Sequence, residues 1–141
     1  KTTDVDQDAA IRLIKDCKEH GVGRFVMISA IGADPNSEST RIQHYLRAKG
    51  VADGYLRSSG LDYTILAPGT LLDEKGTGRI QAAEELGFHG FLPREDLAVC
   101  IIETLRNFYT LGKTIEIVSG ADKIKDAIVE VAGGGDLPPI L

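Results

Sequence analysis

The chain has 141 residues, of which 43% are hydrophobic and 26% are charged, and its formal net charge is −5. This length suits one domain, and this balance argues against intrinsic disorder. The negative charge disfavours a nucleic-acid or anionic-membrane binder, and no apolar run approaches the roughly 18–20 residues that span a bilayer. Two cysteines are too few for a disulfide scaffold, so we expect a cytoplasmic protein with reduced thiols.

The first predicted element is a helix. Apolar residues recur at helical spacing from Val5 to Cys17, and Gly21 is typical of the residue after a helix end. Thr3 followed by Asp6 resembles a capping box, with Asp in place of the usual Glu. Because the chain opens at Lys1 rather than Met, we expect that residues upstream of it are missing.

Two buried strands with a helix between them follow. Arg24–Ser29 is a short, continuous apolar run, which is typical of a buried parallel strand. Residues 32–40 are rich in polar and turn-forming types and predict a loop, and a helix is predicted over about 41–58. Asp62–Ala67 predicts the next strand, which closes on Pro68 and Gly69.

The second half of the chain repeats the alternation of strands and helices after a long irregular segment, Thr70–Leu92. Short strands fit within that segment at Arg79–Ala82 and Phe88–Leu92. Pro93 suits the first turn of a helix that continues to Leu105. A strand over Lys113–Val118 and a helix over 124–131 complete the chain.

This order predicts an α/β fold, with a doubly wound parallel sheet and right-handed crossovers. Only three of the predicted strands are strong, and a helix rather than a strand comes first. Both facts fit a truncated doubly wound domain better than a complete small one.

Tyr45 and Lys49 form the sharpest local pattern. Residues four apart lie on one helical face, and a nearby ammonium favours the phenolate of a tyrosine. The same ammonium can hold ribose hydroxyls, and Ser29, at the end of the preceding strand, can hydrogen-bond a substrate oxygen. Together these residues make a Ser/Tyr/Lys arrangement for hydride transfer to or from a carbonyl, and we predict that they converge on one cleft at the carboxyl ends of the strands.

The spacing alone is weak evidence. Tyr109 and Lys113 are also four apart, but Gly112 lies between them and Lys113 begins a strand, so we predict that this pair is not a site. For Tyr45 and Lys49 the plain alternative is a half-exposed tyrosine beside a solvated lysine.

A family resemblance covers nearly the whole chain. It rests on the strand that ends in Ser29, the helix with Tyr45-Leu46-Arg47-Ala48-Lys49, the strand that closes on Pro68-Gly69, and the helix start Pro93–Ala98. These segments resemble the C-terminal two-thirds of an atypical short-chain dehydrogenase/reductase of the NmrA-like, NAD-dependent epimerase/dehydratase kind. The resemblance implies that residues 1–141 are the C-terminal two-thirds of a single NAD(P)-binding, Rossmann-like domain.

The resemblance also implies roles for individual residues. Ser29 matches the active-site serine, Tyr45 the catalytic tyrosine, and Lys49 the lysine that contacts the nicotinamide ribose. The backbone that lines the nicotinamide end is matched by Pro68, Gly69, Thr70 and Leu71. Asp6 falls where many relatives carry an active-site Asn, and an ionised carboxylate cannot donate a hydrogen bond as an amide can. Asp6 is therefore either a variant catalytic residue or a plain capping residue.

The Gly-rich turn that would cradle the cofactor pyrophosphate is absent from this sequence. Gly21–Gly23, Gly76–Gly78 and Gly133–Gly135 do not follow a strong strand. The residue that would choose between NAD and NADP is missing too, so we expect that roughly 70–80 upstream residues are absent. Residues 1–141 alone should then bind NAD(P)H weakly and self-associate through an exposed sheet edge.

The leading functional prediction is an NAD(P)-dependent oxidoreductase or epimerase-like enzyme with a small-molecule substrate, NADP or NAD as its cofactor, and the capacity to form a homo-oligomer. The alternative is a non-catalytic NAD(P)-binding redox sensor, which Asp6 favours. A third interpretation is an incomplete fold without activity. His20, His44 and His89 are dispersed without ligand spacing, so we predict no metal site.

Overall fold

The computed structural model describes residues 2–38 and 42–133. The chain divides into two compact units. The first comprises Lys1–Phe25 and Gly32–Tyr63, and the second comprises Val26–Ile31 and Thr64–Leu141. The first unit is built from helices, and the second carries nearly all of the β-structure.

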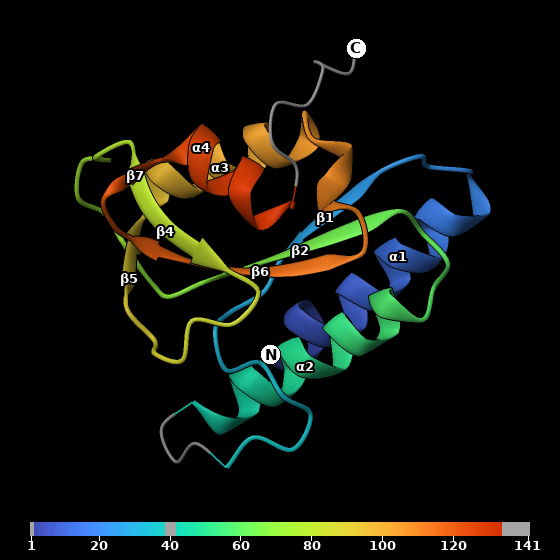
Figure 1. Ribbon diagram of the computed structural model, residues 1–141. Helices are drawn as coiled ribbons and strands as arrows, with labels where there is room; N and C mark the ends of the chain where they lie inside the picture. The colour runs from blue at the N-terminus through green and yellow to red at the C-terminus, as the bar shows by residue number, and fades with distance from the viewer. Residues whose placement is uncertain (1, 39–41, 134–141) are drawn as a thin grey trace. The chain divides into compact units, whose positions relative to one another are not determined.

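The first unit consists of a π-helical turn and two α-helices that contact one another (Figure 1). These are η1 (Thr3–Ala9), α1 (Ala10–Glu19) and α2 (Gln43–Arg57). Ile14 of α1 and Leu56 of α2 are completely buried. The predicted helix end is confirmed, since Gly21 has a φ of 68°, which only glycine adopts freely.

The predicted capping box is wrong. Thr3 lies inside the helical segment rather than before it, and the N-cap residue Thr2 makes no side-chain capping bond. The first turn is π-helical, a wider turn that is rare and often found near functional sites. Asp6 therefore does not serve as a capping partner of Thr3.

The second unit is organised around a five-stranded sheet with strand order β1-β2-β6-β4-β7. The strands are β1 (Phe25–Ile28), β2 (Tyr63–Pro68), β4 (Arg79–Ala83), β6 (Lys113–Ser119) and β7 (Asp122–Lys123). Ser29 N donates to Leu66 O, and Ile31 N, two residues later, donates to Pro68 O, also two residues later. The residue numbers of donor and acceptor rise together, so β1 and β2 run parallel. β6 runs parallel to β2, whereas β4 runs antiparallel to β6 and to β7. The predicted α/β class is confirmed, with a mixed and largely parallel sheet.

A second, two-stranded sheet pairs β3 (Thr70–Leu72) with β5 (Phe91–Pro93) in parallel register. The sequence predicts a short strand near β5 but none at β3, because three residues after a Pro-Gly turn carry no readable alternation. The remaining helices are α3 (Arg94–Leu105), the 3₁₀ turn η2 (Phe108–Thr110) and α4 (Ile124–Val131). Pro93 precedes α3 as its N-cap residue, one position earlier than predicted.

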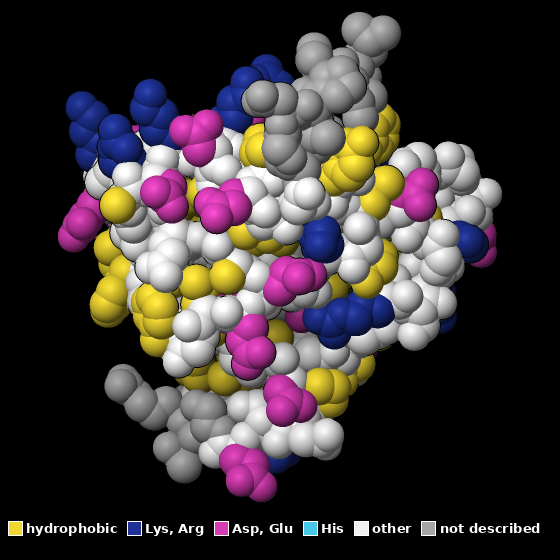
Figure 2. All heavy atoms as spheres, in the orientation of Figure 1, with side chains coloured by type: hydrophobic (Ala, Val, Ile, Leu, Met, Phe, Trp, Pro, Cys, Tyr) yellow, Lys and Arg dark blue, Asp and Glu magenta, His cyan; other side chains and the backbone are white. Residues whose placement is uncertain are grey.

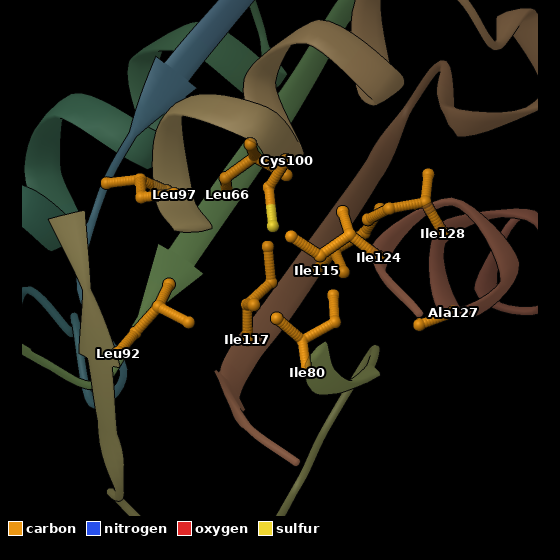
Figure 3. Packing of buried hydrophobic residues seen from close by; sticks show 10 residues of the cluster. All are labelled: Leu66, Ile80, Leu92, Leu97, Cys100, Ile115, Ile117, Ile124, Ala127 and Ile128. Carbon is orange, nitrogen blue, oxygen red and sulfur yellow. The ribbon is translucent and has the colours of Figure 1, made fainter. Parts of the chain in front are cut away.

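The core of the second unit lies where the sheet meets α3 and α4 (Figure 3). Its buried members are Leu66, Ile80, Leu92, Leu97, Cys100, Ile115, Ile117, Ile124, Ala127 and Ile128. The Cys100 side chain points in among these aliphatic residues. Among residues 2–38 and 42–133, no helix combines the length and apolar character needed to cross a membrane.

The Cys100 thiol is held in its neutral form. Burial, reinforced by the nearby carboxylate of Asp96, raises the pKa of Cys100 from 9.0 to about 12. The thiolate is the reactive form, so at pH 8 only about one Cys100 in ten thousand would be reactive. Native protein should therefore react with iodoacetamide at the half-buried Cys17 and not at Cys100.

The same pKa shift gives stability a pH dependence. Above pH 9 the unfolded thiol loses its proton while the folded thiol keeps it, so the free energy of unfolding should fall between about pH 9 and 12. The fall should be steeper than in Cys100→Ala by up to about 1.4 kcal/mol per pH unit. Denaturant unfolding at several alkaline pH values measures the difference, and equal slopes would contradict it.

Candidate functional site

Tyr45 and Lys49 lie one turn apart on α2, in the first unit. The Lys49 ammonium lies 5.6 Å from the centre of the Tyr45 ring, within the range of a cation–π contact. Tyr45 is 36% exposed, so part of this residue is open to solvent. The structure thus places a cation beside the phenol that the sequence analysis singled out.

Asp6 joins this pair from η1. Its Oδ1 lies 3.1 Å from Lys49 Nζ, and the two side chains are 24% and 17% exposed. The helical segments η1 and α2 pack against one another, which brings residues far apart in the chain together. A carboxylate and an aromatic ring therefore share one ammonium, and we name Asp6, Tyr45 and Lys49 the α2 triad.

The loop before α2 is fixed against the same stretch of that helix. Asp34 N donates to Leu46 O at 3.0 Å, and Arg47 Nε donates to Ser37 O at 2.9 Å. A Cβ on Gly50 would lie only 2.4 Å from backbone atoms of Asp34 and Pro35, so the helix and the loop touch through their backbones. This close packing holds the part of α2 that carries Tyr45 and Lys49.

The other predicted site residues gather in the second unit, where β1 and β2 end. Ser29 follows β1 directly and is 2% exposed, and its backbone N–H donates to Leu66 O at 2.8 Å. Pro68 ends β2, and Gly69 N donates to Ile117 O at 3.1 Å. Open α/β sheets bind ligands at the carboxyl ends of their parallel strands. That Ser29 also meets Tyr45 and Lys49 stays a prediction.

Gly69 is a point of very close backbone approach. A Cβ at this position would lie 2.3 Å from His89 O and 2.5 Å from Gly90 O. Thr70, the next residue, donates its backbone N–H to Gly90 O at 3.0 Å, and its Oγ1 lies 3.0 Å from His89 Nε2. This role of His89 is not predictable from the sequence, because its partner is nineteen residues away, a separation that no local pattern indicates.

The backbone N–H groups of Gly76, Thr77 and Gly78 already have anionic partners. Gly76 N donates to Glu95 Oε2 at 2.9 Å, Thr77 N to Asp96 Oδ2 at 3.0 Å, and Gly78 N to Asp96 Oδ1 at 2.9 Å. Asp96 is almost completely buried. This Gly-containing turn binds carboxylates of its own chain, so its amides are not available to a cofactor phosphate.

Tyr109 and Lys113 do not share a helical face, as predicted. Tyr109 lies in η2, Gly112 has a φ of 75°, and Lys113 begins β6. Lys113 Nζ instead lies 3.5 Å from Glu84 Oε1. It sits at the amino end of its strand, whereas Ser29 follows the carboxyl end of β1. In the part of the chain that the structure describes, no group of three His, Cys, Asp or Glu side chains is placed to hold a metal ion.

Comparison of the sequence and structure with known proteins shows which family the chain belongs to. A family model described as NAD(P)H-binding matches residues 1–108, which is more than half of the chain. The chain belongs to the NAD(P)H-binding family. Its sequence and fold place it among the epimerase/dehydratase-like, atypical short-chain dehydrogenases, and its α/β fold matches Rossmann-fold NAD(P)-binding structures.

Individual relatives of this member of the NAD(P)H-binding family are similar over most of its length. It is 36% identical over 129 residues to an uncharacterized sugar epimerase, YhfK, of Bacillus subtilis, covering 91% of this chain and 60% of YhfK. A putative NAD-dependent epimerase/dehydratase from Bacillus halodurans is 35% identical, with a TM-score of 0.88, over 92% of this chain and 62% of that one. ChuY, an anaerobillin reductase from Escherichia coli O157:H7, is 28% identical, with a TM-score of 0.75, over 84% and 60%. The chain thus spans about three fifths of the length of these relatives.

Proposed function

We propose that this chain carries the nicotinamide-proximal part of an NAD(P)-dependent oxidoreductase or epimerase-like enzyme that acts on a small carbonyl or alcohol compound. The observation that carries this proposal is the α2 triad, in which an ammonium lies beside a half-exposed phenol. Family membership supports the cofactor class, and relatives named as epimerases and a reductase support the reaction class.

The residues fit one end of such a cofactor. A partly exposed ammonium suits ribose hydroxyls, and the segment Pro68–Leu71 presents backbone where open α/β sheets bind ligands. The turn at Gly76–Gly78 does not fit the phosphates, because its amides bind Glu95 and Asp96. When bound, the nicotinamide supplies or accepts a hydride.

In this proposal, the protein side chains transfer the proton and orient the substrate and the cofactor. In the direction of reduction, Tyr45 donates its phenolic proton to the oxygen of the carbonyl as the alcohol forms, and in oxidation it takes that proton back. Lys49 holds the cofactor ribose and keeps positive charge beside the phenolate that is left behind. Ser29 donates a hydrogen bond to the same substrate oxygen, and Pro68, Gly69, Thr70 and Leu71 line the nicotinamide end.

The second candidate function is a redox sensor that binds NAD(P) without turnover. The ion pair between Asp6 and Lys49 favours it, because a carboxylate next to the ammonium offsets the charge that a catalytic tyrosine needs. Calorimetric titration of the full-length protein with NADPH and NADH, followed by cofactor oxidation assays with aldehydes and ketones, separates the two functions. Carbonyl-dependent oxidation supports the enzyme, whereas tight binding of both redox forms without oxidation supports the sensor.

Asp6→Asn tests whether Asp6 competes with the cofactor ribose for the ammonium of Lys49. A partly exposed ion pair is worth about 1 kcal/mol, so the free energy of unfolding should fall by about 0.5–1 kcal/mol. Lys49 would no longer share its hydrogen bonds between Asp6 and the ribose, so the Kd of the full-length protein for NAD(P)H should fall by up to about fivefold. Asp8→Asn is the matched control, because Asp8 is an exposed carboxylate on the same η1 segment. Unchanged affinity in Asp6→Asn would argue against a ribose contact by Lys49.

A further inference from the structure

Thr70 and Phe91 lie on one face of the two-stranded sheet formed by β3 and β5. Thr70 pairs with Phe91, and Leu71 pairs with Leu92, in parallel register. Successive side chains of a strand point to opposite faces, so Thr70 and Phe91 share one face and the two leucines share the other. Leu92 is completely buried in the core, with Leu71 packed against the same cluster. Thr70 and Phe91 are both exposed, so at this end of the small sheet their face is turned away from the core.

His89 extends this outward face. Its Nε2 lies 3.0 Å from Thr70 Oγ1, and both side chains are exposed. Within residues 2–38 and 42–133, the hydrogen bond of the His89 ring is the one between Nε2 and Thr70, and Nδ1 has no hydrogen-bond partner. Whichever ring nitrogen carries the proton, Nδ1 can donate to or accept from a ligand while Thr70 fixes the ring through Nε2.

The backbone that carries His89 is held from two sides. Gly69 approaches His89 and Gly90 so closely that no Cβ fits between them. On the other side, a Cβ on Gly90 would lie 2.5 Å from Cγ1 of Val118, a buried residue of β6. The imidazole thus projects from a fixed backbone rather than from a freely moving loop, which is what a binding residue requires.

The outward face adjoins the proposed nicotinamide end and exposes aromatic rings. Thr70 follows Gly69 and Pro68, and Pro68 ends β2 at the same edge of the sheet as Ser29. Phe91 is 58% exposed and Phe88 is 49% exposed. Figure 2 shows hydrophobic side chains at the surface on the side of the molecule where Figure 1 places β5. Exposed aromatic surface next to a fixed polar pair is typical of a ligand-binding face.

We propose that Thr70, His89 and Phe91 form a substrate-binding face for flat aromatic carbonyl compounds. The ring of the ligand stacks on Phe91, and a hydroxyl on that ring bonds Nδ1 of His89. Thr70 acts as a positioning residue that holds the imidazole. The proposal deepens the proposed function, on which it rests for the reaction but not for binding.

Three ketones test the face on the full-length protein saturated with NADP⁺, with which a ketone cannot react. They are 4-hydroxyacetophenone, acetophenone and cyclohexyl methyl ketone, and their Kd values are measured by saturation-transfer NMR. Wild type should prefer the hydroxylated ring over acetophenone by about three- to tenfold, the value of one hydrogen bond. It should also prefer acetophenone over the non-planar ketone by about twofold or more, because only a flat ring stacks.

Substitutions assign each preference to its residue. His89→Ala should abolish the preference for the hydroxyl, and Phe91→Ser should abolish the preference for the flat ring. Phe108→Ser, which replaces a 47% exposed phenylalanine on η2, should keep both preferences. If His89→Ala and Phe91→Ser keep both preferences, or if wild type binds none of the ketones, the face is refuted. If the ketones bind with these preferences but are never reduced by NADPH or NADH, the proposed reaction is refuted. The proposed binding face is then still supported.

Discussion

Tyr45→Phe is expected to lower the turnover of the full-length protein by about 10²–10⁴-fold, the usual contribution of a positioned proton donor. The substitution removes one oxygen and keeps the ring, so the cation–π contact with Lys49 remains. The Kd for NADPH and NADH should therefore change little. Steady-state kinetics with any reducible carbonyl compound, together with calorimetric titration of the cofactor, measures both quantities.

Tyr109→Phe is the control for this prediction. Tyr109 also precedes a lysine by four residues, and it is 49% exposed, but Gly112 separates it from Lys113 on β6. Its replacement should leave turnover unchanged. Equal losses in the two variants, or no loss in Tyr45→Phe, would remove the proton-transfer role from Tyr45.

Gly69→Ala is expected to have the largest effect on stability. The new methyl group would lie 2.3 Å from His89 O and 2.5 Å from Gly90 O, and neither backbone oxygen can rotate out of the way. Overpacking of this kind costs about 1–3 kcal/mol or more in the free energy of unfolding. Displacement of His89 should also abolish the preference for a hydroxylated ring that is tested above.

Gly54→Ala supplies the matched control. Gly54 lies inside α2, and a Cβ there would have no heavy atom within 4 Å apart from its chain neighbours and the nearby backbone of the same helix. Because alanine favours the helix over glycine, this variant should gain about 0.5–1 kcal/mol. Denaturant unfolding of both variants measures the two opposite changes, and a Gly69→Ala protein as stable as wild type would contradict the close approach.

The sequence predicts the elements whose signals are local. The apolar run at Phe25–Ile28 and the alternation at Lys113–Ser119 each specify a strand, and Gly21 specifies a helix end. The antiparallel direction of β4 is not readable, because it depends on pairing with β6 across a long segment of chain. β7 is missed for another reason, since two residues carry no periodicity.

In the candidate site, too, residues with a local sequence signal are predictable, and residues brought together only by the fold are not. Tyr45 and Lys49 are predicted from their spacing on one helix, and Ser29 is predicted from its place at the end of the preceding strand. The family resemblance adds the expected role of each residue. The partner of Asp6 is not predictable locally. A carboxylate three residues after Thr3 has the pattern of a cap, yet the packing of η1 on α2 gives it Lys49 instead. The role of His89 is not predictable for the same reason, because only the folded backbone brings His89 close to Thr70.

Deuterium transfer tests the central claim most directly. Full-length protein is incubated with NADPH or NADH that carries deuterium at C4 of the nicotinamide, in turn on each face, and with a panel of aldehydes and ketones that includes 4-hydroxyacetophenone. The products are analysed by mass spectrometry and NMR. We expect deuterium on the carbon of the reduced carbonyl, from one face of the nicotinamide only, with the transfer strongly reduced in Tyr45→Phe. Transfer that proceeds equally well in Tyr45→Phe, or a cofactor that binds tightly and keeps its label with every carbonyl compound, would contradict the account.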